Sequence, residues 1–375
     1  MSEPFPFGLP PATAGYATLY ALTLFLHAVL LSYVLAGAGW VAVHALGRAG
    51  ARGSAGRVAA LLVDWLPFAL GGAITLGVAP LLFVQILYRE AFYTSNLLLF
   101  WRWMAIVPAL VAGFYGLYLA KSGRFAPRTL ARRALGLGTF AAFAFVAFSF
   151  TDQHALALAR GSWVRVYQGG PLSWREPAVV VRFGLWLAAA LPAMAALVGW
   201  QLRAAAKRQA APLEPREVRG LAVAAGVGLV LAAALALAYR GLVSEVEAAA
   251  LSGPLARPWL FVAGAGALAA GLAWVAVGFW GRLGRAALGA ASLGTALAML
   301  GVIAAREAQR LAVLDVDALA VLHVRAAQAG GLPLFVAFLA VNAAVIAAAV
   351  ALVRRGLRAH AEGAAGAPPA GDAHQ

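Results

Sequence analysis

A histidine inside the first long apolar stretch is the strongest candidate for chemistry in this sequence. His27 lies in TLFLHAVLLSY, about eleven residues into a run that begins near Tyr16, which places it near mid-membrane at ~1.5 Å per residue. Neutral imidazole is a good axial ligand for haem iron, and it is also a good hydrogen-bond partner for a neighbouring helix. His27 is therefore the candidate metal ligand of a b-type haem, with a core histidine as the alternative.

Two arginines and a methionine lie at membrane depth and could assist such a group. Arg102 occurs in FWRWMA, about eight residues into the third apolar run, and Arg182 lies a few residues into the fifth. Each either extends toward the headgroups or neutralises a haem propionate or a quinone-like head group. Met104 lies at nearly the depth of His27, so a His/Met axial pair is one interpretation and simple space filling is the other.

A second group of polar and aromatic residues is expected at one membrane face, where the second, third and fourth apolar runs meet. Its members are Gln85, Tyr88, Glu90 and Tyr93 from VQILYREAFYTSN, with Asp152 and His154 from FSFTDQHAL. An aromatic and polar pocket suits a quinol head group, and Asp152, Glu90 or His154 would accept its protons. The alternative is an interfacial aromatic belt with solvated loop charges.

The composition shows which elements must position these residues. The chain has 375 residues, 63% hydrophobic and 11% charged, with mean hydropathy +0.84. Soluble domains are roughly 45–50% apolar and about 25% charged, so a soluble enzyme, a disordered chain and a secreted disulfide scaffold are excluded. The chain has no cysteine, which excludes disulfides, thiolate metal sites and iron–sulfur clusters.

Nine apolar runs predict an all-α, polytopic transmembrane helix bundle, because only helices and closed barrels satisfy the backbone in lipid. The expected spans are residues 16–46, 67–88, 94–119, 133–151, 179–201, 218–239, 259–280, 284–305 and 332–353. Residues 1–15 precede the bundle, which covers 16–354, and residues 355–375 read as a disordered cytoplasmic tail. Residues 51–65 are expected to lie on the membrane surface before the second span.

The charges predict the orientation. On the membrane face where the first span ends, the loops and the tail carry 18 basic and five acidic residues. The segments on the opposite face carry nine basic and nine acidic residues. The basic side is expected in the cytoplasm, so the N-terminus lies outside. The formal net charge of +15 then comes from basic residues on the cytoplasmic side of the membrane, and it indicates no nucleic-acid partner. These features predict a multi-pass protein of the bacterial inner membrane.

The expected spans contain no clear carboxylate, which argues against a proton-coupled pump. With His27 as a candidate haem ligand and the polar cluster as a candidate quinol site, the leading hypothesis is an integral membrane subunit of a bacterial respiratory or electron-transfer complex. Its expected partners are the lipid bilayer and either other membrane subunits or c-type cytochromes. Two alternatives stay open: a transporter-like or permease-like bundle without redox chemistry, and a cofactor-free anchor for cytochromes.

One stretch also suggests a family. The run GVAPLLFVQILYREAFYTSN (residues 77–96), followed by an aromatic third span, resembles a group of bacterial multi-spanning proteins that is distantly similar to subunit I of cytochrome bd-type quinol oxidases. The span number, the outside N-terminus and the histidine in the first span agree with that architecture. The resemblance implies haem b, held by His27, and electron exchange with quinol near the periplasmic face.

The sequence departs from that family at four places. It has no GRQPW-type motif, and the loop after the sixth span comprises only residues 240–258. Residues 179–186 contain no histidine where the family has one, and residues 97–119 contain no acid. These departures favour a reduced relative with one haem or none over an enzyme with three haems.

Overall fold

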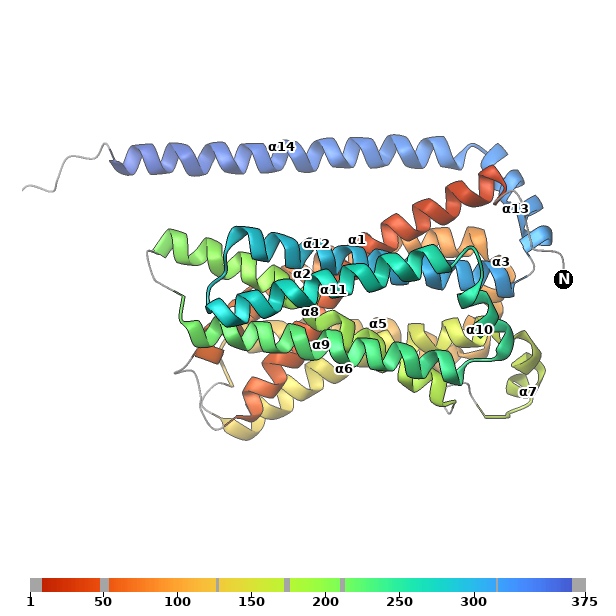
Figure 1. Ribbon diagram of the computed structural model, residues 1–375, viewed down its shortest axis with the longest axis horizontal. Helices are drawn as coiled ribbons and strands as arrows, with labels where there is room; N and C mark the ends of the chain where they lie inside the picture. Colours follow the sequence, from red (N-terminus) through yellow and green to blue (C-terminus); the bar gives the residue numbers. More distant parts are fainter. Residues whose placement is uncertain are drawn as a thin grey trace, which may run out of the picture. The chain divides into compact units, whose positions relative to one another are not determined.

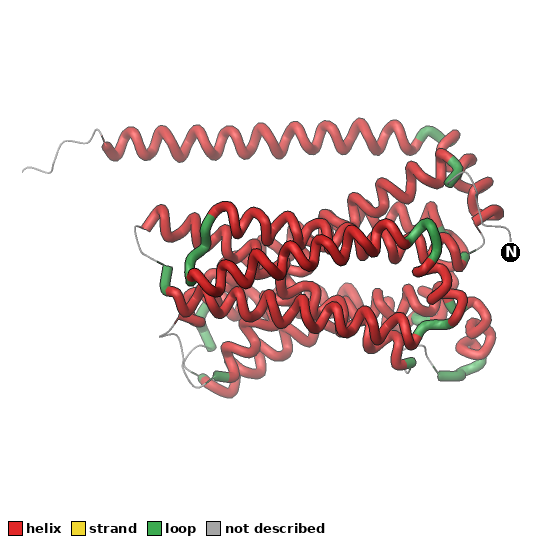
Figure 2. The backbone as a smooth tube through the Cα atoms, viewed as in Figure 1, coloured by secondary structure: helices red, strands yellow, loops and turns green. Residues whose placement is uncertain are grey.

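The computed structural model describes residues 9–47, 54–125, 128–171, 176–209, 213–314 and 316–365. Every regular element in these ranges is a helix (Figure 2). The chain divides into two compact units, Met1–Ala320 and Val321–Gln375. The fold is therefore all-α, as the sequence predicts.

The first unit is a bundle of long helices joined by short ones (Figure 1). Its elements are α1 (Pro11–Leu46), α2 (Ser54–Leu87), α3 (Arg89–Leu98), α4 (Phe100–Met104), α5 (Ile106–Lys121), α6 (Thr129–Leu158), η1 (Arg160–Ser162), α7 (Trp163–Tyr167), α8 (Pro177–Gln209), α9 (Pro215–Leu242), α10 (Glu245–Ser252), α11 (Arg257–Trp280) and α12 (Arg285–Val313). The short helices α3, α7 and α10 gather at one end of this unit, the end at which α1 begins and α12 finishes (Figure 1). We call it the outer end.

Eight helices among the described residues are long and apolar enough to cross a membrane, and all eight lie in the first unit. A bent pair, Leu319–Gln328 and Gly331–Val345, meets at 64° and makes nine if it counts as one span. The second unit contains most of α13 (Val316–Gln328) and all of α14 (Gly331–Ala365), which includes the ninth expected span. The protein is a multi-pass membrane protein with a polytopic helix bundle.

The surface of the bundle has the character expected of a lipid-facing wall. Large apolar side chains point outward from several long helices, which a water-soluble protein of this size would bury. Examples are Phe68 on α2, Val107 on α5, Val230 and Leu237 on α9, and Leu272 and Phe279 on α11. Acyl chains rather than water are the solvent that such a surface fits.

Close contact between backbones holds α11 against α12. A Cβ atom added to Gly266 would stand 2.5 Å from the backbone nitrogen of Ala298, and one on Gly301 would stand 2.6 Å from the nitrogen of Ala263. Real Cβ atoms cannot approach that closely, so only glycine allows this contact. Small residues are the usual means of packing helices in lipid, where apolar burial gives little drive for association.

Two expected boundaries differ in the structure. Residues 54–65 do not form a separate surface helix, because α2 continues without interruption through Pro67 and Pro80. The third span instead breaks at Leu99 and Ala105, dividing into α3, α4 and α5. Pro108 explains the second break, since it has no N–H to donate to the carbonyl of Met104.

A third boundary matters most for the site. The sequence ends the eighth span at residue 305, but α12 continues for about two more turns, to Val313. Arg306, Glu307 and Arg310 lie in those turns and were expected to be loop charges; that expectation is wrong. At the other end of the chain, α14 extends to Ala365, so helix covers the start of the expected tail, and residues 366–375 lie outside the described residues.

Candidate functional site

The predicted polar cluster divides into an exposed part and a buried part. Gln85, Glu90 and Tyr93 lie on the surface of α2 and α3, where the Tyr93 hydroxyl donates to Gln85 Oε1 at 2.8 Å. Tyr88, Asp152 and His154 are instead buried. The structure therefore brings the predicted residues to one end of the bundle without joining them in a single pocket.

The exposed part is bordered by aromatic rings that pack edge to face. The ring of Phe92 lies 5.4 Å from that of Tyr93 and 5.8 Å from that of Trp103, and Trp103 lies 5.1 Å from Phe150. We call Gln85 with these four aromatic residues the aromatic rim. Its rings come from α3, α4 and α6, so the break between α3 and α4 turns Trp103 toward Phe92.

The buried residues of α6 each have a partner on another helix. Asp152 is fully buried and forms an ion pair with Arg102 of α4, whose guanidinium also lies 5.3 Å from the ring of Phe148. The next residue, Gln153, donates from Nε2 to the hydroxyl of Ser95 on α3 at 2.8 Å. Arg102, expected as the counter-charge of a ligand, thus has a counter-charge within the protein.

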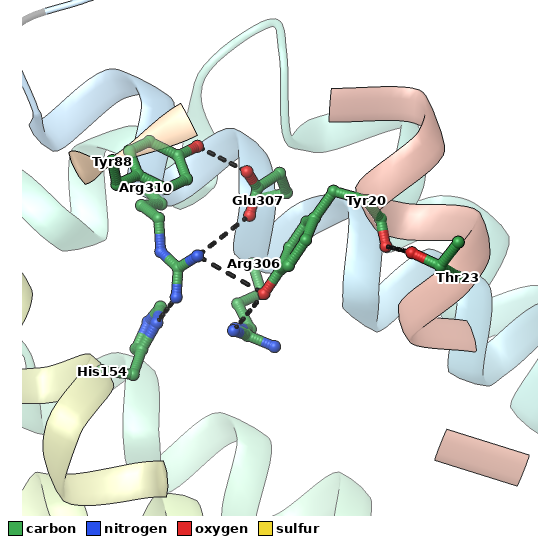
Figure 3. Close-up of polar contacts among 7 residues, drawn as sticks. All are labelled: Tyr20, Thr23, Tyr88, His154, Arg306, Glu307 and Arg310. Atoms are coloured by element: carbon green, nitrogen blue, oxygen red, sulfur yellow. Dashed lines mark hydrogen bonds and ion pairs between the residues drawn. The ribbon is translucent and has the colours of Figure 1, made fainter. Parts of the chain in front are cut away.

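The third consecutive residue, His154, enters a network centred on α12 (Figure 3). Arg310 donates to His154 Nδ1, and its guanidinium also lies 3.6 Å from Glu307 Oε2. On the far side of Glu307, the Tyr88 hydroxyl donates to Oε1 at 2.5 Å. The ring of Tyr88 in turn lies 4.8 Å from the Arg310 guanidinium carbon, so Tyr88 contacts both members of the ion pair.

Tyr20 of α1 closes this network from the opposite side. Its hydroxyl oxygen accepts from Arg306 at 2.9 Å and from Arg310 at 3.4 Å (Figure 3). Arg182 of α8 is also buried and donates to the hydroxyl of Tyr239 on α9 at 2.9 Å. We call Tyr20, Tyr88, His154, Arg182, Tyr239, Arg306, Glu307 and Arg310 the arginine cluster.

The chain ends of the long helices explain why this cluster forms. Tyr20 and Arg182 lie near the starts of α1 and α8, whereas His154, Tyr239 and Arg310 lie near the ends of α6, α9 and α12. Antiparallel spans bring these starts and ends to the same membrane face. Tyr88 occupies the bend between α2 and α3, where its backbone leaves the helical region with φ −138° and ψ 44°.

Tyr88 stands just outside the span Gly56–Leu87 and keeps its proton. Burial raises the pKa of its phenol well above 10, and the Glu307 carboxylate raises it further. The hydrogen bond therefore runs from a neutral phenol to the carboxyl group of Glu307. That pair places a proton donor and a proton acceptor next to each other at the outer end.

His27 contacts α2 rather than the arginine cluster. A carbonyl oxygen can only accept, so Nδ1 donates to the backbone oxygen of Ala73 at 2.8 Å and Nε2 keeps its lone pair. A Cβ on Gly77 would stand 2.9 Å from His27 Cε1, so the ring packs directly on the α2 backbone. Met104 is 57% exposed on α4, so its side chain is directed outward and is not packed beside His27.

The donor set at His27 offers a haem one nitrogen atom. Metal-bound histidines usually donate their other ring N–H to a carbonyl or carboxylate, as His27 does to Ala73. The same bond is what a histidine that only joins α1 to α2 would make. Among the described residues, no group of three or more His, Asp or Glu side chains is arranged to hold a metal ion.

The site residues that the sequence did not predict are Tyr20, Tyr239, Arg306, Glu307 and Arg310. One signal for the last three was present, because Arg306 and Glu307 stand four and three residues before Arg310, the spacings that bring side chains together on a helix. The expected spans 133–151 and 284–305 contain no carboxylate, but α6 and α12 continue beyond them, and Asp152 and Glu307 are buried in those continuations.

Comparison with known proteins identifies no relative. No protein-family model matches the chain, and neither the curated proteins nor the solved structures give a match.

Proposed function

We propose that this chain is an integral membrane subunit of a bacterial electron-transfer complex, and that it binds a quinone head group at the aromatic rim. In this proposal the protein lies in the inner membrane with its outer end toward the periplasm, as the charge bias of the loops predicts. Its protein partners are other membrane subunits or c-type cytochromes, which take up or deliver the electrons.

The observation that carries the proposal is the hydrogen bond from Tyr88 to the buried carboxylate of Glu307. A quinol that is oxidised releases two protons and two electrons, so its site needs a proton acceptor as well as a slot for the ring. Tyr88 lies on the chain between Gln85 and Tyr93 of the rim, and its hydroxyl donates to Glu307. In this proposal Tyr88 takes a proton from a quinol at the rim while it gives its own to Glu307.

The rim supplies the other requirements of a quinone site. Tyr93 is exposed and Gln85 is half-buried beside it. The Tyr93 hydroxyl donates to Gln85 Oε1 and Gln85 Nε2 donates to the Leu81 carbonyl, so a quinone carbonyl would take over the hydroxyl proton of Tyr93 and the second Nε2 proton of Gln85. Trp103 and Phe150 provide partly exposed ring surface on which a quinone ring can pack, and the buried ring of Phe92 supports Trp103 from behind. The site lies on the lipid-facing wall, which is where a quinone with an isoprenoid tail arrives.

Photolabelling with an azidoquinone tests this proposal on the purified full-length protein. We expect label on the peptides of α3 and α4. We also expect Gln85→Leu with Tyr93→Phe to raise the Kd of a short-chain quinone about thirtyfold, since two hydrogen bonds of about 1 kcal/mol each are lost. Tyr115→Phe is the matched control, an exposed tyrosine on α5 away from the rim. Label confined to other helices, or equal affinities in all three proteins, would refute quinone binding at the rim.

The haem part of the proposal rests on His27 alone and is tested separately. A bound haem b would supply one-electron transfer, and His27 would hold it through Nε2 while Ala73 keeps the ring oriented. A reduced-minus-oxidised spectrum of the purified protein should then show a Soret and α-band change that is lost in His27→Ala. A flat spectrum would remove haem from the proposal and leave the quinone site standing.

One observation favours the alternative of a transporter. The buried carboxylates Asp152 and Glu307 are groups that an ion-coupled carrier would need. Both are engaged by basic partners, Asp152 by Arg102 and Glu307 by Arg310. Uptake by proteoliposomes that depends on a proton gradient, without quinone binding, would select this alternative.

A further inference from the structure

The arginine cluster carries more positive charge than its described residues neutralise. Three guanidiniums, of Arg182, Arg306 and Arg310, interact electrostatically with His154 at the outer end of the bundle. Glu307 is the one carboxylate in the cluster, and it pairs with Arg310. The nearby Glu247 of α10 is held by Ser244 and reaches Gln309 rather than an arginine. The formal balance among these residues is two positive charges.

The unfilled hydrogen-bonding positions of the cluster are also mostly donors. Arginine has no acceptor, so His154 Nδ1 must accept from Arg310, and the imidazole proton is then on Nε2. That Nε2–H is buried and has no partner in the described part of the chain. The Nε–H groups of Arg306 and Arg310 are in the same condition. Three buried N–H donors therefore lack an acceptor.

A buried cation and a buried donor without partners are both unfavourable, and the same group can correct both. It must be negative, carry about two charges, and present several acceptor atoms. A phosphate group with one ester bond or none has up to two negative charges and three or more free oxygens, and guanidinium is the side chain that binds it best. A single carboxylate has one charge and two oxygens, which match less well.

We infer that the arginine cluster binds a phosphate group, which His154 Nε2 and the guanidiniums of Arg306, Arg310 and Arg182 would hold. The phosphate comes either from the aqueous phase or from a phospholipid head group at the outer face. Arg306 and Tyr239 are partly exposed while the rest of the cluster is buried, so they mark the side from which it enters. Bound there, it would join α6, α8 and α12 and offset the repulsion between Arg182 of α8 and the two arginines of α12. The inference does not depend on quinone binding at the rim.

Titration of the purified full-length protein in a phosphate-free maltoside detergent tests this inference. Inorganic phosphate and phosphatidic acid are added in separate arms, and binding is measured by the rise of the apparent Tm and by equilibrium dialysis with labelled phosphate. We expect saturable binding in at least one arm. Binding of inorganic phosphate identifies the aqueous source, and binding of phosphatidic acid alone identifies the lipid source.

The variants separate binding from folding defects. Arg310→Gln should weaken binding at least tenfold, and Glu307→Gln should tighten it several-fold because it removes the one repelling carboxylate. A variant that was merely misfolded would not bind more tightly, so the second result is diagnostic even if Arg310→Gln fails to fold. Arg165→Gln, on the exposed surface of α7 at the same end, is the matched control and should bind as the unaltered protein does. No binding in either arm, or equal binding by the control and both cluster variants, would overturn the inference.

Discussion

The carboxylate of Glu307 provides the sharpest test of the electrostatics at the outer end. Replacing Glu307 by Gln keeps the shape of the side chain and an acceptor for Tyr88, but it removes the negative charge beside Arg310. The side chains of Glu307 and Arg310 are only 5% and 4% exposed, so water can replace little of the lost attraction. Removing one partner of a buried ion pair costs about 3–5 kcal/mol. At roughly 2 °C per kcal/mol in a large domain, the apparent Tm should fall by about 6–10 °C.

The assay is the thermal unfolding of the detergent-solubilised protein in phosphate-free buffer, followed by intrinsic fluorescence at one scan rate because such transitions are often irreversible. Glu90→Gln is the matched control, since Glu90 is an exposed glutamate at the same end of the bundle. A surface change of this kind should cost under about 0.5 kcal/mol. If Glu307→Gln and Glu90→Gln melt within 1–2 °C of each other, roughly 1 kcal/mol by the same conversion, Glu307 is not a buried counter-charge and the electrostatic argument fails.

Three further predictions concern other parts of the bundle. Arg102→Gln should destabilise the protein by about 3 kcal/mol because it leaves Asp152 buried without its ion-pair partner. The double variant Arg102→Met with Asp152→Leu should lower the melting temperature by less than the two single changes together. If the decreases in melting temperature are additive, this pairing is contradicted. Gly266→Val should lower the free energy of unfolding by about 2–3 kcal/mol because it forces α11 away from α12. Gly264→Ala should be nearly neutral because there is open space around a Cβ at that position. Similar melting temperatures of the two variants would show that the helices do not meet at Gly266. Because the chain has no cysteine, single introduced cysteines can report the topology without background labelling. Tyr167→Cys should react with a membrane-impermeant maleimide added outside, and Arg124→Cys should react only from the cytoplasmic side. The reverse pattern would show that the orientation is inverted.

The span pattern was predictable because the bilayer is a uniform solvent that sets the length of each element. Twenty or so apolar residues in a row identify a crossing whatever lies beside it, so eight of the nine runs each fall in one long helix. The third run is divided among α3, α4 and α5. The boundaries were less predictable where polar residues continue a helix. The eighth run was ended at residue 305 because Arg306 and Glu307 look like loop charges, yet their partners on other helices allow α12 to continue.

The site was likewise predictable in part from the sequence. Tyr88, Asp152 and His154 could be assigned to one membrane face from the sequence alone, since antiparallel spans return to that face and residue depth follows from the rise per residue. Their partners could not be assigned. Asp152 pairs with a residue 50 positions away, His154 with one 156 positions away, and Tyr88 with one 219 positions away. The depth of a residue in the membrane follows from its position along the helix. The neighbour that its side chain faces depends on how the adjacent helices are rotated and tilted. Only the packed bundle determines that rotation, and so only the tertiary structure turned expected loop charges into a buried cluster.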